Sequence, residues 1–167
     1  MHHFVAKTKL ADSRLPLMSS SHRPDPSSLA QALKVDPGLG QEALARYSTS
    51  YVDMLGFLPP RVSARMQVTG ALDPQILEMQ ERLRDHAMGT PHLDPKTVQL
   101  VLFAILLMDM NDAAKTHGLA ARRAGATWEE LQSIISLCFL FRGLPAANRG
   151  ADILAALALE ESQSTKA

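Results

Sequence analysis

The sequence predicts one all-α domain of about six to seven helices, and three observations support this. Asp-Pro pairs at residues 36, 73 and 94 open segments with helical apolar spacing, where aspartate is a good N-cap and proline suits the first helical position. Residues 100–108 are continuously apolar, which is typical of a helix at the centre of a helical domain. No segment alternates apolar and polar residues between hairpin turns, so strands are not expected.

The charge and the cysteine content exclude several kinds of protein. Lys+Arg and Asp+Glu both number 17, so the chain lacks the basic surface that nucleic-acid binding requires. The same balance argues against a membrane surface as a partner and is compatible with self-association. Cys138 is the single cysteine, which excludes an intramolecular disulfide and a CxxC redox pair.

The two ends of the chain differ in composition from the part between them. Residues 1–26 are rich in Ser and Pro without a helical period, which predicts a flexible N-terminal arm, and they lack the apolar core of a secretory signal. The helical domain is expected over residues 27–162, and a polar tail over residues 163–167. The run 100–108 is about half of the roughly 20 residues that a membrane span needs, so a cytoplasmic protein is expected.

Capping aspartates, glycines and prolines divide the domain into helical segments. We expect helices over residues 37–55, 74–88 and 95–108, around His117, over residues 128–142, and from about Pro145 to the polar tail. The signals after Pro26 and over residues 62–70 are shorter. The His117 segment is rich in small residues and ends at Gly125. Thr127 and Glu130 then have the spacing of a capping box, in which each side chain bonds the other residue's backbone N–H.

Three motifs follow one another in the second half of the chain. Leu93-Asp94-Pro95-Lys96 precedes the apolar helix, the pattern H-x2-A-A-x3-G-A-T-x-E-E-L begins at His117, and Gly143-Leu144-Pro145-Ala146 comes later. In this order and spacing the motifs resemble the carboxymuconolactone decarboxylase and AhpD-like family, over about residues 50–155. The resemblance implies an AhpD-like helical subunit that forms a homo-oligomer (a dimer, trimer or hexamer), with a small pocket near the histidine.

The family has a peroxidase-like branch and a decarboxylase-like branch, and the resemblance favours the second. The peroxidase-like branch uses a CxxC pair and a glutamate one helix earlier. Here the positions that match the cysteines are Met110 and Ala113, and the glutamate position falls on Gln99 or Val98. Since none of these side chains can form a thiolate or a carboxylate, AhpD-type peroxidase chemistry is not expected.

His117 is the candidate catalytic residue, because imidazole exchanges protons near neutral pH. On a helix continued back from His117, Met110 lies about 20° and Ala113 about 40° from it, so both are expected to line the pocket. The alternative is a packed core histidine bonded to a backbone carbonyl.

Three polar residues are candidates for binding a substrate. Arg142 and Arg149 flank the Gly143 turn, and a guanidinium there could bind a carboxylate in two-point fashion; the alternative is a salt bridge at the surface or between subunits. Gln99 could orient a substrate carbonyl, or it could be a buried amide bonded to a neighbouring backbone group.

Neither a metal site nor a reactive thiol is expected. His86 and His92 flank a loop with Gly89 and Pro91, and nothing in the sequence fixes them beside His117. Cys138 has the spacing of a core residue, so it is interpreted as a structural thiol.

The sequence therefore predicts a lyase or isomerase that needs no cofactor and acts on a small organic acid or lactone, with His117 transferring the proton. The alternative is a non-catalytic binding or assembly subunit of the same fold, which the missing glutamate and cysteines favour. A peroxidase-like protein ranks third.

Overall fold

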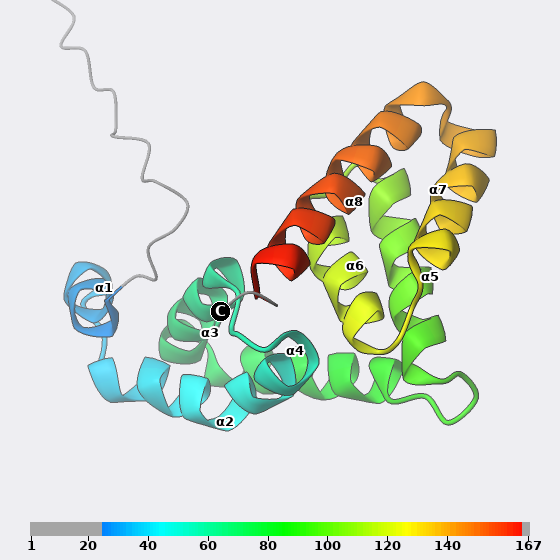
Figure 1. Ribbon diagram of the computed structural model, residues 1–167. Helices are drawn as coiled ribbons and strands as arrows, with labels where there is room; N and C mark the ends of the chain where they lie inside the picture. Colours follow the sequence, from blue (N-terminus) through cyan, green and yellow to red (C-terminus); the bar gives the residue numbers. More distant parts are fainter. Residues whose placement is uncertain (1–24, 165–167) are drawn as a thin grey trace, which may run out of the picture.

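The computed structural model describes residues 25–164, and these residues form eight α-helices and no strand (Figure 1). The predicted all-α class is confirmed, and the helix number is slightly above the six to seven predicted. The helices are α1 (Pro26–Leu33), α2 (Pro37–Leu55), α3 (Pro60–Leu72), α4 (Pro74–Met88), α5 (Pro95–Met108), α6 (Ala113–Arg123), α7 (Trp128–Arg142) and α8 (Leu144–Ser164). Residues 1–24 of the predicted arm, and residues 165–167 of the predicted tail, lie outside the described range.

Aspartate side chains start four of the helices. Asp25, Asp36, Asp73 and Asp94 each accept a hydrogen bond from a backbone N–H of the first turn, and proline follows each of them. The Asp94 carboxylate accepts from both the backbone N–H and the hydroxyl of Thr97, at 3.0 and 2.6 Å. At eight residues α1 is too short to persist alone, and the Asp25 cap and contacts with α2 and α3 stabilise it. This short helix is one reason why the helix number exceeds six to seven.

The turn between α6 and α7 is fixed by the predicted capping box. Thr127 Oγ1 accepts from the Glu130 backbone N–H at 3.1 Å, and the Glu130 carboxylate accepts from the Thr127 N–H at 2.7 Å. The other oxygen of the Glu130 carboxylate accepts from Lys96 Nζ at 2.7 Å. The start of α7 is thereby tied to the start of α5.

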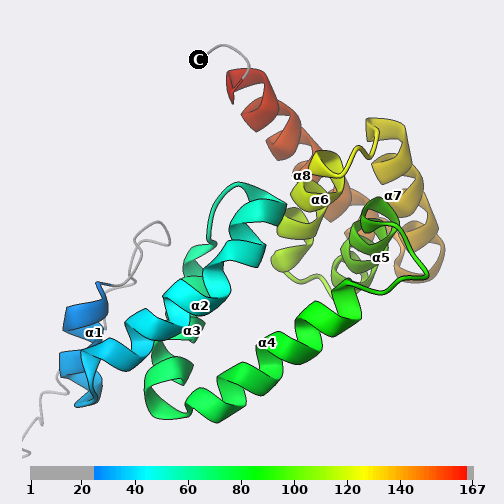
Figure 2. The ribbon, with the colours of Figure 1, turned by 90° about the horizontal axis from the view of Figure 1, so that it is seen from below.

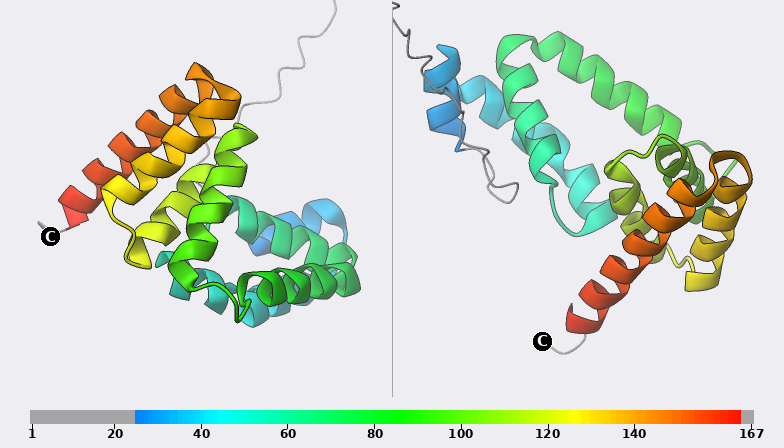
Figure 3. Two further views of the ribbon diagram at one scale, coloured as in Figure 1. Left: turned by 90° about the vertical axis from the view of Figure 1, so that its right-hand side faces the viewer. Right: turned by 90° about the horizontal axis from the view of Figure 1, so that it is seen from above.

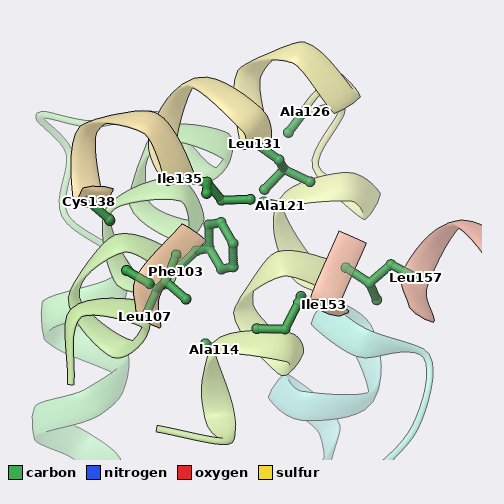
Figure 4. Close-up of a cluster of buried hydrophobic side chains, with 11 residues drawn as sticks. Phe103, Leu107, Ala114, Ala121, Ala126, Leu131, Ile135, Cys138, Ile153 and Leu157 are labelled. Carbon is green, nitrogen blue, oxygen red and sulfur yellow. The ribbon is translucent and has the colours of Figure 1, made fainter. Parts of the chain in front are cut away.

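The core consists of two clusters of buried side chains, one in each half of the chain. The first half, α1–α4, and the second half, α5–α8, lie on opposite sides of the molecule (Figures 1 and 2). The first cluster belongs to α2, α3, α4 and the α2–α3 connection, and it contains Ala43, Tyr51, Leu58, Met66 and Leu77. The second cluster surrounds Phe103 and joins α5, α6, α7 and α8 (Figure 4). The C-terminal part of α2 meets α6, so the two halves touch beside the helix that carries His117.

Helices α7 and α8 form an antiparallel pair at the end of the molecule away from α1 (Figure 3). Gly150 lies at a close approach of the two helices, since a Cβ built on it would lie 2.6 Å from a side-chain carbon of the buried Ile135. Arg122 of α6 binds the far end of α8 through two bonds of 2.9 Å to the Glu161 carboxylate. With this support α8 continues to Ser164, past residue 162 where the polar tail was expected to follow.

Candidate active site

His117 lies half-buried on α6 and is bonded to α5 rather than to a backbone carbonyl. Its Nδ1 is 2.8 Å from Oε1 of Gln99, whose side chain is buried. The Gln99 amide nitrogen in turn donates to Met54 Sδ at 3.4 Å. Helices α2, α5 and α6 thus each contribute one member of a chain of contacts that fixes the imidazole ring.

This bonding defines the protonation of the His117 ring. An amide oxygen can only accept, so Nδ1 carries the hydrogen and Nε2 keeps its lone pair. Burial, and secondly the positive charge of Arg84, lower the pKa of His117 from 6.5 to about 4. At neutral pH the imidazole is therefore uncharged, and Nε2 is available as a proton acceptor.

A cavity of about 340 Å³ lies next to His117, between the two halves of the molecule. Its size is within the range of small-molecule sites. The polar side chains in its wall are those of Tyr51, Arg61, Arg84, Asp112, Thr116 and His117. Apolar side chains supply most of the remaining wall, among them Met54, Leu55, Phe57 and Val62.

Arg84 is a cation of this cavity that the sequence analysis missed. Its guanidinium carbon lies 3.8 Å from the ring centre of Tyr51, and Nη1 donates to Asp85 at 2.9 Å and to Ser50 at 3.3 Å. Stacking on the ring leaves the Arg84 guanidinium in the wall of the cavity that contains His117.

The second arginine of the cavity, Arg61, is linked to its rim. The Asp112 carboxylate accepts from Arg61 at 3.3 Å and from Arg149 at 2.5 Å, so it joins α3 to α8 across the start of α6. Since Asp112 and Arg61 are both exposed, their ion pair is weak and open to competition from a bound anion.

The structure does not bring Arg142 or Arg149 to the cavity as the sequence analysis expected. Arg142 is exposed at the end of α7, and Arg149 reaches the rim only through Asp112. The Gly143 turn belongs to the far end of the α7–α8 pair, whereas the cavity lies beside α2, α3 and α4. The arginines of the cavity are Arg61 and Arg84 instead.

Of the two residues expected beside His117, Ala113 lines the cavity and Met110 does not. The helix does not continue back to Met110: α6 begins at Ala113, whose N–H is capped by the Asn111 side chain at 2.9 Å. Met110 has a φ of 56°, in the left-handed region, so the chain turns there and its angle on a helix around His117 has no meaning.

Cys138 and the histidines give no sign of a redox or metal centre in the described chain. The Cys138 thiol is buried in the second core cluster, where burial raises its pKa and disfavours the reactive thiolate. Within residues 25–164 no three His, Cys, Asp or Glu side chains are grouped so as to hold a metal ion.

Comparison with known families assigns part of the chain to one of them. The family described as the carboxymuconolactone decarboxylase family matches residues 74–156. These residues place the chain in the carboxymuconolactone decarboxylase family. Searches of curated proteins and of solved structures give no match.

The family match covers α4 to α7 and most of α8, and it begins later than the resemblance over about residues 50–155 suggested. Arg84, Gln99 and His117 therefore belong to the carboxymuconolactone decarboxylase domain. Tyr51 and Arg61 come from the helices before it and complete the cavity. None of the described helices is long and apolar enough to cross a membrane.

The missed residues carried only a partial signal in the sequence. Leu77, Glu81 and Arg84 have the i, i+4, i+7 spacing of one helix face, and Leu77 and Glu81 are buried. That spacing indicates that Arg84 points inward with them. That this face meets Tyr51 and lies beside His117 depends on the packing of α4 against α2 and of α2 against α6, which periodicity does not encode.

Proposed function

We propose that this protein is an enzyme that binds a small organic acid or lactone beside His117 and transforms it by proton transfer without a cofactor, as an isomerase or a carboxy-lyase. One observation supports this most directly: an uncharged imidazole, fixed by Gln99, lines a cavity that also contains the Arg84 guanidinium. A proton acceptor and an anion-binding group are the two parts that such a reaction needs.

His117 serves as the base in this proposal. Nε2 takes a proton from a carbon next to a carbonyl and returns it to another carbon, which is an isomerisation with no net gain or loss of protons. Gln99 keeps the ring in the Nδ1–H tautomer, so that Nε2 is always the accepting atom. For decarboxylation, the carbanion left by loss of CO₂ must be protonated, whereas the resting His117 ring is uncharged at neutral pH because burial and Arg84 lower its pKa. Isomerisation begins from this uncharged form of the ring.

The charges of the cavity favour an anionic substrate. Arg61 and Arg84 contribute two positive charges to the wall and Asp112 contributes one negative charge, which Arg149 also neutralises. Arg84 is the better anion-binding group, because its stacking on Tyr51 holds it in place. Small carboxylic acids and lactones that carry a carboxylate fit this combination of a cation, an apolar wall and a base.

The second candidate is a binding subunit without catalysis, and the partner of His117 favours it. The resemblance implies a carboxylate where the structure has the Gln99 amide, and without that negative charge the imidazolium is not stabilised. In this case the cavity binds a small acid and leaves it unchanged.

Turnover of a panel of small acids and lactones, with carboxymuconolactone among them, separates the two candidates. The enzyme hypothesis expects product by NMR or mass spectrometry, and a loss of at least about 100-fold in kcat for His117→Gln. His86→Gln is the matched control, since His86 is an exposed histidine at the end of α4. Binding of a panel member with no turnover, or turnover that survives His117→Gln, would contradict the enzyme hypothesis.

The proposal also includes a homo-oligomer in the cytoplasm. Leu137, Leu140, Phe141 and Leu144 lie at the α7–α8 turn with large exposed fractions, which is the kind of apolar surface that subunit contacts cover. The cytoplasmic location rests on the sequence and is tested by cell fractionation.

A further inference from the structure

Glu81 is a buried carboxylate for which the proposed reaction gives no role. It lies on α4, is only 1% exposed, and contacts Tyr51 of the first core cluster. Removing a carboxylate from water costs several kcal/mol, and apolar residues in place of a buried ion pair often give a protein of equal or higher stability. Stability alone is therefore a weak explanation of Glu81.

The hydrogen bonds of Glu81 lead to Tyr51. The Tyr51 hydroxyl lies 3.3 and 3.2 Å from the two Glu81 oxygens. Arg65 of α3 forms an ion pair with Glu81 and also donates to the Tyr51 hydroxyl oxygen at 3.1 Å, while its other terminal nitrogen donates to Gln80 at 3.0 Å. The Tyr51 hydroxyl is thus held by a carboxylate and a guanidinium together, and these bonds restrict the position of the ring.

The ring held in this way carries the cation of the cavity. The Arg84 guanidinium lies over the Tyr51 ring at 3.8 Å, and Arg84 comes three residues after Glu81, one turn along α4. A stacked guanidinium follows the position of its ring. Glu81, Arg65 and Tyr51 thereby link α2, α3 and α4 to the place of one charged group in the wall of the His117 cavity.

We propose that Glu81 and Arg65 are positioning residues, which act through the Tyr51 ring to hold the Arg84 guanidinium in the cavity beside His117. The inference rests on the proposed anion-binding role of Arg84. In this proposal the network of Glu81, Arg65 and Tyr51 serves to fix the geometry of the site rather than to stabilise the fold.

The test measures two quantities in the full chain: the His117 pKa by NMR titration of the imidazole without ligand, and the Kd for benzoate as an anionic probe. Glu81→Gln is expected to free Arg84, which raises the His117 pKa and weakens benzoate binding by about tenfold. The opposite sign is expected if Glu81 acts only by its charge, because loss of a negative charge lowers the pKa of an imidazole. Glu78→Gln is the matched control, since Glu78 is a half-buried carboxylate on the same helix, paired with Arg46 at 3.5 Å.

A second comparison in the Arg84→Gln variant tests whether the effect of Glu81 on the His117 pKa passes through Arg84. With Arg84 absent, Glu81→Gln should raise the His117 pKa no further. A rise of equal size in both backgrounds, a fall, or no change in a folded Glu81→Gln protein overturns the inference. If Glu81→Gln does not fold, Tyr51→Phe is judged by the same criteria, because it keeps the ring and removes only the hydroxyl that Glu81 and Arg65 hold. Absence of benzoate binding by the wild type counts against the proposed function alone, since the pKa comparison needs no ligand.

Discussion

His117 Nδ1 and Gln99 Oε1 lie 2.8 Å apart, so an amide stands beside the imidazole where the family resemblance implies a carboxylate. The amide fixes the ring without adding negative charge. The charge state of His117 is consequently set by burial and by Arg84, both of which lower its pKa. Because the Gln99 amide adds no negative charge, the histidine stays uncharged at neutral pH and begins a reaction as a base.

Replacing Gln99 by glutamate should convert His117 from a base into an acid near neutral pH. A carboxylate that accepts from Nδ1–H stabilises the imidazolium, so the pKa should rise from about 4. An NMR titration of the imidazole resonances measures this rise. Gln132→Glu, at an exposed position on α7, is the control and should leave the His117 pKa in place. An unchanged pKa in Gln99→Glu would show that the amide does not face the ring.

The low pKa of His117 should also make folding stability depend on pH. The unfolded chain takes up a proton near pH 6.5 and the folded chain only near pH 4, so stability is full above about 6.5 and falls as the pH drops toward 4. Over this window His117 should account for a loss on the order of 3 kcal/mol. Urea denaturation at a series of pH values measures it. His117→Gln should flatten the curve in that window, and an equally steep curve in the variant would assign the dependence to other groups.

The sequence predicts best the features that depend on residues close together in the chain. The Asp36, Asp73 and Asp94 caps and the Thr127 capping box are all present, because each is made within one helical turn. The bond between Gln99 and His117 was not predicted, because the sequence analysis had Gln99 orient a substrate carbonyl or bond a backbone group. This bond depends on the packing of α5 against α6.

The features that the sequence analysis missed depend on packing between distant segments. Arg84 lies in the His117 cavity only because α4 packs on α2, which in turn packs on α6, and Arg61 arrives from a third helix. Met110 was placed wrongly for a different reason. The prediction assumed one unbroken helix from Met110 to His117, but Met110 itself has a left-handed backbone and α6 begins only at Ala113. Local sequence patterns therefore identified His117, the proposed base. The cavity arginines Arg61 and Arg84 depend on packing between helices and were not predicted.

Gly150 should be intolerant of even one added methyl group. In an open helix Gly→Ala stabilises a protein, but here the new Cβ would lie 2.6 to 2.8 Å from three carbons of Ile135, so α7 and α8 must move apart. The expected loss from Gly150→Ala is roughly 1–3 kcal/mol by urea denaturation. The paired variant Gly150→Ala with Ile135→Val removes one of the clashing carbons and should recover part of the loss. No recovery would mean that Ile135 is not the obstacle.

The exposed end of the α7–α8 pair should be a contact between subunits. Leu140 and Phe141 are 69% and 85% exposed, and neighbouring Leu137 and Leu144 are also exposed, so the apolar surface is contiguous along the chain. Leu140→Glu with Phe141→Glu should place two unpaired charges in such a contact and reduce the mass measured by size exclusion with light scattering. Leu159→Glu is the control, because Leu159 is 63% exposed but lies toward the other end of α8. A wild-type monomer would refute the oligomer itself, whereas an oligomer that survives the double substitution would place the contact elsewhere, for example on the exposed face of α4 that carries Met79 and Leu83.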